Sequence, residues 1–189
     1  MYFSQPLFPA TLIKRYKRFL ADVKSDDGTC VTVHTANTGA MLGCADPGMK
    51  VWLKDTQNPA RKYRLSWDIV ENHEGTLIGI NTILANGLVR EAIESGVVSQ
   101  LQGYDDIKSE VKYGTLGSRV DFLLKNTVTG NQCFVEVKNV TASLVPGVAL
   151  FPDAISKRGS KHLEELMDCV AAGSRMKSIR FMARPCVER

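Results

Sequence analysis

The sequence lacks the marks of a secreted, membrane-spanning or zinc-ribbon protein. Its five cysteines are scattered, and none lies in a CxxC spacing, which favours free thiols in a reducing compartment over structural zinc. No apolar run approaches the length of a membrane span, and the opening "MYFSQPLFPATLIKRYKRF" lacks the basic-then-apolar order of a signal peptide. We therefore expect a cytoplasmic protein without a membrane partner.

Several familiar catalytic motifs are also missing. There is no Ser–His–acid pattern, no glycine-rich phosphate loop and no HExxH, and "GINTILANG" is not a dinucleotide fingerprint. The sequence contains no internal repeat and no low-complexity segment. These absences argue against triad hydrolases, P-loop nucleotidases and HExxH metalloproteases.

What the chain does have is the size of one large or two small globular domains. It contains 189 residues, 44% of them apolar, with 24 Lys and Arg against 20 acids. The net charge of +4 is mild. It permits a nucleic-acid partner without requiring one, because local basic patches matter more than the total charge.

Residues 1–82 predict a small β-barrel. Turn signals such as "SDDG" and the loop "NTGAMLGCADPGM" separate five strand patterns. These patterns occupy residues 11–24, 29–35, 50–55, 62–70 and 76–82. Five short strands favour an oligonucleotide-binding (OB) barrel, although the pattern alone does not separate it from other small barrels.

Residues 83–189 predict an α/β domain. Asn86 is expected to cap a first helix that ends at Gly96. Strand patterns follow at residues 106–114, 118–125 and 132–141, and a last helix is predicted over 156–173. That helix carries an apolar stripe that should pack on the sheet. The stripe consists of Leu163, Leu166, Met167, Val170 and Ala171.

The segment "SRVDFLLKNTVTGNQCFVEVKNVT" predicts an antiparallel hairpin with charges on one face. A symmetric turn centred in "NTVTGN" places Asp121 opposite Glu136, with Cβ atoms about 4.5–5.5 Å apart. Lys138 lies two residues beyond Glu136 and so points to the same face, about 7 Å along the strand. A slip of one residue in register would break this alignment.

Two directly opposed carboxylates repel each other. A hard cation such as Mg²⁺ between Asp121 and Glu136 removes that cost, because Mg²⁺ favours one or two carboxylates, waters and a substrate phosphate. A lysine beside it orients water or stabilises charge on phosphorus, as metal-assisted phosphodiester hydrolysis needs. The alternative is an ordinary cross-strand triad, in which Lys138 neutralises both acids at a solvated sheet edge.

Three further acids are candidates for an extra ligand or for holding a water. Glu91 and Glu94 lie on the polar side of the predicted first helix, and Glu110 lies in a strand that leads towards Asp121. For each of them the alternative is a solvated surface position.

Basic residues gather in two runs of the barrel, "KRYKRF" and "RKYR". The members are Lys14, Arg15, Lys17, Arg18, Arg61, Lys62 and Arg64, interleaved with Tyr16, Phe19 and Tyr63. This mixture is typical of single-strand binding through phosphate pairing and base stacking. A solvated barrel rim is the alternative.

A third basic cluster opens the last helix and consists of Lys157, Arg158, Lys161 and His162. Cations are disfavoured at a helix N-terminus, where the macrodipole is positive. The cluster therefore indicates a docking place for an anion such as phosphate. The other two histidines, His34 and His73, are expected to be structural or simply exposed.

Many separated motifs agree in order and spacing with a known family. They include "YKRFLADV", "HTANTGAMLG", "NPARKY", "SRVDFLL", "CFVEVKNVT" and "ALFPDAISKRGSKHL", and they cover about residues 8–172. On these motifs the chain resembles the bacterial sugar fermentation stimulation protein family. The resemblance implies an OB-like DNA-binding barrel over 1–82 and a nuclease-like α/β domain of the PD-(D/E)xK class over 83–189.

The resemblance also implies roles for individual residues. The class's two motif acids fall on Asp121 and Glu136 and its lysine on Lys138, while Val120 stands where the class name has proline. The family is regarded as DNA-binding, with a regulatory link to sugar, notably maltose, metabolism. It therefore implies a nucleoid-associated DNA-binding protein of little sequence specificity that, if active, hydrolyses phosphodiester bonds with Mg²⁺ or Mn²⁺.

Two other function classes remain as alternatives. One is a non-catalytic DNA-binding regulator that keeps the nuclease fold as a platform. The other is a ligand-sensing protein, which no sequence feature supports. A homodimer is compatible with either class.

The end of the chain departs from the family pattern. After "HLEELMDCVAAG" the family continues with a strongly apolar strand and several tens of residues, whereas this chain gives "SRMKSIRFMARPCVER". Pro185 withholds a ladder N–H, so we expect at best a short edge strand around residues 179–182. The comparison implies a truncated C-terminus that leaves apolar sheet and helix surface uncovered, which lowers stability or drives oligomer formation.

Overall fold

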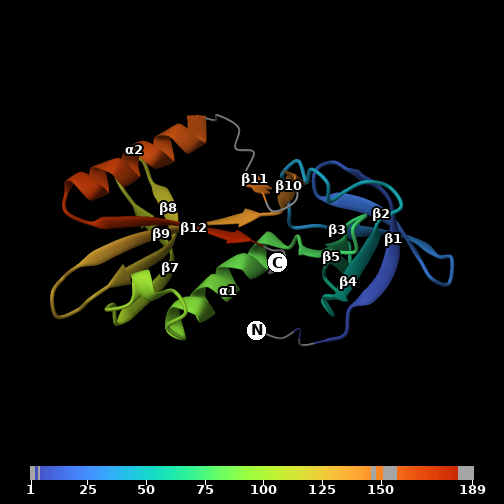
Figure 1. The fold of residues 1–189 in the computed structure, drawn as a ribbon, viewed down its shortest axis with the longest axis horizontal. Helices are drawn as coiled ribbons and strands as arrows, with labels where there is room; N and C mark the ends of the chain where they lie inside the picture. Colours follow the sequence, from blue (N-terminus) through green and yellow to red (C-terminus); the bar gives the residue numbers. More distant parts are fainter. Residues whose placement is uncertain (1–2, 4, 146–147, 151–156, 183–189) are drawn as a thin grey trace. The chain divides into compact units, whose positions relative to one another are not determined.

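The computed structural model describes residues 3, 5–145, 148–150 and 157–182 (Figure 1). The chain forms two compact units. The first takes the chain up to Ala85 together with a small hairpin of β10 (Ala142–Val145) and β11 (Val148–Leu150). The second takes Asn86–Lys138 and the later segment up to Phe181.

The first unit is built on a closed five-stranded barrel, as predicted. Its strands are β1 (Phe8–Tyr16), β2 (Leu20–Ser25), β3 (Cys30–His34), β4 (Lys50–Asp55) and β5 (Leu65–Glu71). The order is β3-β2-β1-β4-β5, and a parallel pairing of His34 with Ser66 joins β3 to β5 and closes the barrel. A short strand, β6 (Leu77–Gly79), adds to the outside of β5.

The prediction of one long strand over residues 11–24 is wrong. The chain reverses between β1 and β2, where Lys17 and Arg18 have φ angles of 49° and 66°. This left-handed conformation is uncommon for residues other than glycine, so the sequence carries no turn signal there. The hairpin supplies two barrel strands instead of one, and the predicted strand at 76–82 becomes β6, outside the barrel.

The barrel interior is filled by alternating side chains of its strands. Leu12, Val23, Val51 and Trp67 are all buried to within about 1% of full enclosure. This alternation of inward apolar and outward polar residues is the pattern from which the sequence predicts the barrel.

The second unit is an α/β layer structure. Its sheet has the order β12-β9-β8-β7, formed by β7 (Asp106–Tyr113), β8 (Ser118–Lys125), β9 (Gln132–Val140) and β12 (Arg175–Met182). Two helices accompany it, α1 (Thr82–Glu94) and α2 (Lys157–Ala171), and a single 3₁₀ turn spans Ser99–Leu101. In Figure 1, α2 lies above the sheet and α1 below it. Neither helix is long and apolar enough to cross a bilayer.

Helix α1 begins four residues before the predicted cap. The side chain of Asn81 accepts a hydrogen bond from the backbone N–H of Ile83 (3.1 Å), which is the contact of an N-cap residue. Asn86 therefore lies inside the helix, and the prediction that it caps the helix is wrong. Its side chain is left available for another partner.

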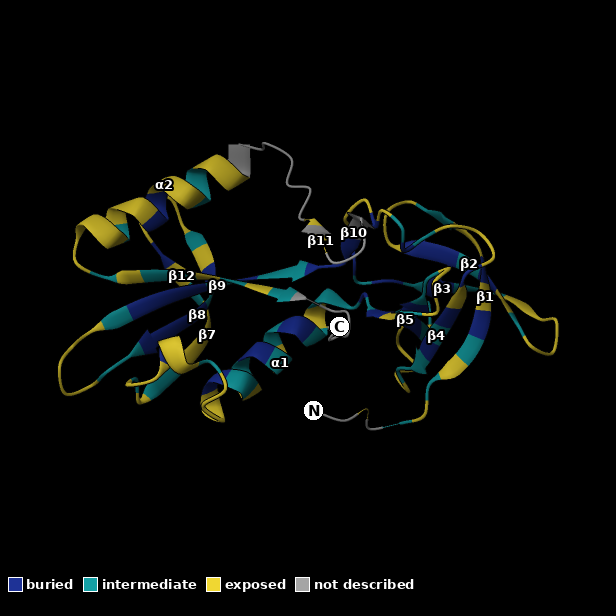
Figure 2. Cartoon of the chain, in the orientation of Figure 1, coloured by how far each residue is buried: buried dark blue, intermediate teal, exposed yellow. Residues whose placement is uncertain are grey.

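The apolar stripe predicted for α2 does not pack on the sheet as a whole. Leu166 is buried against Tyr113, Val120, Leu123 and Phe134, but Leu163, Met167 and Val170 are exposed. Most of α2 is coloured as exposed in Figure 2. The inward side of the helix also carries Glu165, which is only 3% exposed. Polar contacts, described below, set the rotation of this helix in place of the apolar stripe.

The expectation of at best a short edge strand at the end of the chain is also wrong. Strand β12 runs over eight residues and pairs with β9 at the edge of the sheet. Its apolar and charged residues are mixed, which an edge strand tolerates because one of its sides meets no neighbouring strand. Met176 packs on the core cluster of the unit. Pro185 lies outside the described residues.

Candidate functional site

The β8–β9 hairpin has the predicted register. Phe122 lies opposite Val135 and Lys125 opposite Gln132, and the paired residues end there, one residue short of Asp121 and Glu136. In the turn, the Asn126 side chain accepts hydrogen bonds from the backbone N–H groups of Val128 and Thr129 (3.0 and 2.8 Å). This turn chemistry fixes which residues face each other, and it puts the two acids on neighbouring strands.

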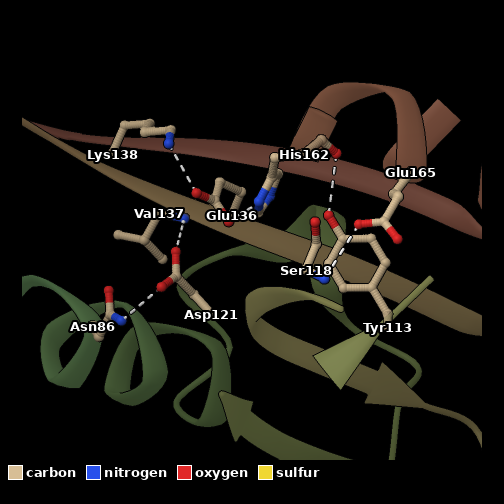
Figure 3. A network of polar contacts seen from close by, with 9 residues as sticks. All are labelled: Asn86, Tyr113, Ser118, Asp121, Glu136, Val137, Lys138, His162 and Glu165. Atoms are coloured by element: carbon tan, nitrogen blue, oxygen red, sulfur yellow. Dashed lines mark hydrogen bonds and ion pairs between the residues drawn. The ribbon is translucent and has the colours of Figure 1, made fainter. Parts of the chain in front are cut away.

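Asp121 is held at both of its carboxylate oxygens (Figure 3). Its Oδ2 accepts the backbone N–H of Val137 at 2.7 Å, and its Oδ1 accepts the side-chain amide of Asn86 at 3.0 Å. The carboxylate therefore lies against β9, at the residue between Glu136 and Lys138.

Glu136 lies between two basic side chains. Lys138 Nζ donates to its Oε1 at 2.8 Å, so Glu136 and Lys138 do share a face, and His162 Nε2 lies 3.3 Å from its Oε2. His162 comes from the first turns of α2, and the sequence predicts that it binds nucleic acid. Its imidazole lies beside Glu136 of β9 and contacts the ring of Tyr113 edge-on with centroids 5.7 Å apart, while its role in nucleic-acid binding stays a prediction.

Tyr113 packs against His162 and hydrogen-bonds to its backbone. Its hydroxyl donates to the backbone carbonyl of His162 at 3.2 Å. Burial, and after it the nearby charges of Glu136 and Glu165, raise the pKa of Tyr113 to about 12. The phenol is therefore neutral at physiological pH, and it acts as a hydrogen-bond donor rather than as a base.

A second, fully enclosed acid lies a turn further along α2. The backbone N–H groups of Leu116 and Ser118 donate to Glu165 at 2.5 and 3.2 Å. The hydroxyl of Ser118 and these N–H groups hold the pKa of Glu165 below its usual value. Lys161 adds a contact to the same β7–β8 turn, since its Nζ lies 2.5 Å from the Leu116 carbonyl. Lys161 is also among the residues predicted to bind nucleic acid.

The lone pairs that remain on Asp121 and Glu136 define what the two acids could hold. Each carboxylate oxygen has two lone pairs. Both oxygens of Asp121 and Oε1 of Glu136 accept one hydrogen bond each, and Glu136 Oε2 lies 3.3 Å from His162 Nε2, so every oxygen retains capacity for a further partner. Within the described residues no three His, Cys, Asp or Glu side chains gather into a metal-binding group. Two carboxylates fit Mg²⁺ or Mn²⁺, which complete their coordination with water and substrate oxygens.

Two of the additional acids pair with other residues. Glu94 pairs with Arg90 at 2.8 Å along the same helix, and Glu110 lies 3.6 Å from Arg119. Glu110 also has a left-handed φ of 55°. Glu91 is exposed. Their roles as extra ligands stay predictions.

The basic runs of the barrel contain two kinds of side chain: tied ones, which hydrogen-bond to other groups of the barrel, and untied ones, which are exposed and make looser contacts. Arg15 donates to the backbone carbonyls of Arg18, Asn37 and Gly39, and Arg18 donates to Thr38. Arg64 forms a two-pronged contact with Asp55 at 2.8 and 2.5 Å. The remaining members have looser surroundings: Lys14 lies 3.4 Å from Asp22, Lys62 lies over the ring of Tyr63, and Lys17 and Arg61 are exposed.

Aromatic rings also lie on the barrel beside the basic runs. Phe19 is 43% exposed, and its ring lies 6.1 Å from that of His34. Burial, and after it the charge of Arg61, lower the pKa of His34. The side chains of Lys157 and Arg158, which complete the predicted cluster on α2, lie outside the described residues.

Sequence reasoning misses two helix side chains with partners in the sheet: Asn86 of α1 donates to Asp121, and Glu165 of α2 accepts from the β7–β8 turn. The sequence pattern makes Asn86 a helix cap and gives Glu165 no role. An asparagine inside a helix is a signal in itself, because asparagine disfavours helix interiors. A glutamate between two apolar positions of the α2 stripe is the corresponding signal for Glu165.

Comparison with known proteins places the chain. Its residues 83–189 match the family model described as the sugar fermentation stimulation protein RE domain, and residues 13–80 match the SfsA N-terminal OB domain. The chain belongs to the sugar fermentation stimulation protein family. The predicted OB barrel followed by an α/β domain is thereby confirmed.

Curated members of the sugar fermentation stimulation family are close in sequence. A homolog from Thioalkalivibrio sulfidiphilus is 54% identical over 173 residues, covering 92% of this chain and 72% of the relative. A homolog from Citrifermentans bemidjiense is 54% identical over 186 residues, covering 97% and 78%. A solved structure of Pyrococcus furiosus SfsA in complex with Ca²⁺ is 28% identical, with a TM-score of 0.84 over the whole of this chain and 78% of its own.

Proposed function

We propose that this family member is a nucleic-acid-binding protein whose α/β unit hydrolyses phosphodiester bonds with Mg²⁺ or Mn²⁺. The observation that carries the proposal is the arrangement of Asp121, Glu136 and Lys138. The two acids lie on the neighbouring strands of one hairpin, and Lys138 Nζ donates to Glu136 at 2.8 Å. The P. furiosus relative was solved with Ca²⁺, which supports a divalent-cation site in this fold.

In this proposal each side chain has a separate task. Asp121 and Glu136 would hold the cation through their remaining lone pairs, a site type that Mg²⁺ favours together with waters and a substrate phosphate. A bound divalent cation polarises a phosphoryl oxygen and lowers the pKa of its water. Lys138 donates hydrogen bonds towards the phosphate or the attacking water, because its ammonium already lies beside Glu136.

The barrel supplies the substrate contacts. Lys17, Arg61 and Lys62 pair with phosphates, and the exposed ring of Phe19 offers a surface for stacking of a base. Such contacts read the backbone and not the sequence, so we expect little sequence specificity. The natural partner is then DNA of the bacterial nucleoid, reached in the cytoplasm.

A second candidate, from a different class, is a non-catalytic DNA-binding regulator of sugar, notably maltose, genes. The close pairing of Lys138 with Glu136 favours it, because that ion pair already neutralises one of the two acids. In this case the α/β unit serves only as a binding platform.

A cleavage assay separates the two candidates. The purified chain is incubated with single-stranded, duplex and branched DNA, with and without Mg²⁺ or Mn²⁺. We expect metal-dependent cleavage that falls at least about 100-fold in Lys138→Ala and in Glu136→Gln, because each removes a group needed at the transition state. Lys108→Ala is the matched control, since Lys108 is a paired, exposed lysine of the same sheet.

Binding measured on the same samples completes the test. DNA bound without cleavage in the parent chain would favour the regulator. Cleavage that survives undiminished in both site variants would place the chemistry elsewhere in the chain. Absence of any salt-dependent DNA binding would contradict both candidates.

A further inference from the structure

We propose that Asn86 is a positioning residue, which holds Asp121 in the orientation that a divalent cation requires. The inference rests on the proposed function and deepens it, because it concerns the same cation site. It assigns a role to a residue of α1, an element that sequence motifs of the site do not include.

The placement of Asn86 in the helix is the first observation. Asn86 lies in the second turn of α1, next to Ala85 and one turn before Val89, both of which are buried. Asparagine inside a helix is less favourable than alanine. A contact outside the helix must offset that cost, and the amide of Asn86 donates to Asp121 Oδ1 at 3.0 Å.

The second observation is that a backbone N–H of β9 binds the side chain of Asp121. The paired residues of β8 and β9 run from Lys125 and Gln132 to Phe122 and Val135. At the following step the N–H of Val137 donates to the Asp121 side chain at 2.7 Å. A backbone donor of the strand is thus used to hold this carboxylate, and not to extend the ladder.

Together the two donors fix the plane of the carboxylate. Val137 holds one oxygen and Asn86 the other, so rotation of the group would break at least one bond (Figure 3). Each oxygen keeps a lone pair for a cation. Hydrogen-bond partners of this kind orient metal ligands, and their removal typically weakens metal binding by about 10–100-fold.

A purely structural role predicts a different result. If Asn86 only joined α1 to β8, its removal would lower the thermal midpoint of the cation-free chain and leave cation affinity unchanged. Arg90→Ala is the matched control, because Arg90 lies one turn further along α1 and donates to Glu94 and Ser109, not to Asp121.

Calorimetric titration with Mn²⁺ and with Ca²⁺ tests the proposal on the full chain without any substrate. We expect Asn86→Ala to raise the dissociation constant about 10–100-fold. Asn86→Gln keeps an amide donor on a longer stem and should fall between the parent and Asn86→Ala. Arg90→Ala should match the parent. If Asn86→Ala fails to fold, the comparison of Asn86→Gln with Arg90→Ala carries the test.

The outcomes are distinguishable. A dissociation constant within twofold of the parent in both Asn86 variants would overturn the positioning role and leave the proposed function standing. A parent chain that binds neither cation at millimolar concentration would overturn the proposed function, and the positioning role with it.

Discussion

Glu165 and Glu136 are both carboxylates of the α/β unit, yet the protein surrounds them in opposite ways. Glu165 is 3% exposed and receives backbone N–H groups from the β7–β8 turn. Glu136 is contacted by side chains, Lys138 and His162, which can rotate away. The first arrangement leaves no room for a ligand, whereas the second can exchange its partners for one.

The contrast separates a structural acid from a candidate functional acid. Backbone donors are fixed by the fold, so an enclosed acid that receives them at both oxygens, as Glu165 does, ties elements together and has no room for a ligand. Side-chain donors can serve the acid in one state and a substrate or water in another. A strongly held carboxylate is therefore not by itself a sign of an active site; the nature of its donors matters more.

The barrel shows the same contrast among its basic residues. Arg15 and Arg64 bind loop carbonyls and Asp55, respectively, and so hold the barrel's own loops. Lys17 and Lys62 are exposed, and within the described residues no carboxylate pairs with either. Exposed lysines of this kind can bind a phosphate without first breaking a contact within the barrel, whereas Arg15 and Arg64 cannot.

The largest loss of stability should come from a substitution in the β7–β8 turn that removes the space occupied by the Glu165 carboxylate. Gly114 has a φ of 66°, and a Cβ there would collide with the carboxylate of Glu165. Gly114→Ala therefore adds a collision to the cost of a left-handed alanine, which is itself about 1–2 kcal/mol. We expect a loss of about 2 kcal/mol or more, which lowers the thermal midpoint by roughly 4–8 °C.

Gly117→Ala is the control for this prediction, measured by the same thermal unfolding. Gly117 lies in the same turn with a φ of 74°, but a Cβ there would meet nothing within 4 Å. It should show the backbone cost alone. Equal losses in the two variants would mean that the fit of Glu165 into the turn contributes nothing to stability.

A smaller effect is expected from Glu165→Gln, and it should depend on pH. Because the folded-state pKa of Glu165 is lowered, its contribution is present above the unfolded pKa of about 4.3 and is lost as pH falls through the folded value. The parent should thus exceed Glu165→Gln in thermal midpoint at pH 7, and the gap should narrow below about pH 4. Glu164→Gln, an exposed neighbour on α2, is the control. A gap that stays constant from about pH 7 to about pH 3 would refute the ionic explanation.

The smallest effect concerns the untied lysines of the barrel. Lys17→Ala and Lys62→Ala should each reduce the slope of log affinity against log salt for single-stranded DNA by about 0.7. Arg64→Ala should change that slope little, because its guanidinium is engaged by Asp55. Fluorescence anisotropy at several salt concentrations gives the slopes. A larger change in Arg64→Ala than in the lysine variants would reverse the assignment of tied and untied charges.

The parts of the site that depend on local chemistry are predictable from the sequence. Alternation and a turn at residues 126–131 are enough to define the strand pairing, because side chains repeat every two residues and the turn fixes their register. That pairing puts Asp121 and Glu136 on neighbouring strands, just beyond the paired residues, and Lys138 on the face of Glu136. The barrel is predictable for the same reason.

The features that were predicted wrongly depend on contacts between residues distant in sequence. The rotation of α2 follows from Glu165 and His162 meeting β7–β9 residues, which no local pattern encodes. The turn at Lys17 and Arg18 needs a left-handed backbone without glycine, and it is accompanied by contacts of Arg15 and Arg18 with the loop at residues 37–39. Tertiary partners decide both features, so propensity points the wrong way.

The attachment of α2 to the β7–β8 turn has a consequence for the order of folding. Glu165 and Leu116 are 49 residues apart, and Glu165 and Ser118 are 47 apart, whereas each hairpin of the sheet closes a loop of only a few residues. Short loops close at lower entropic cost than long ones, so we expect the hairpins to form early and α2 to dock last. The same helix should then be the first to detach on unfolding, and Glu165 should show a low φ-value in kinetic experiments.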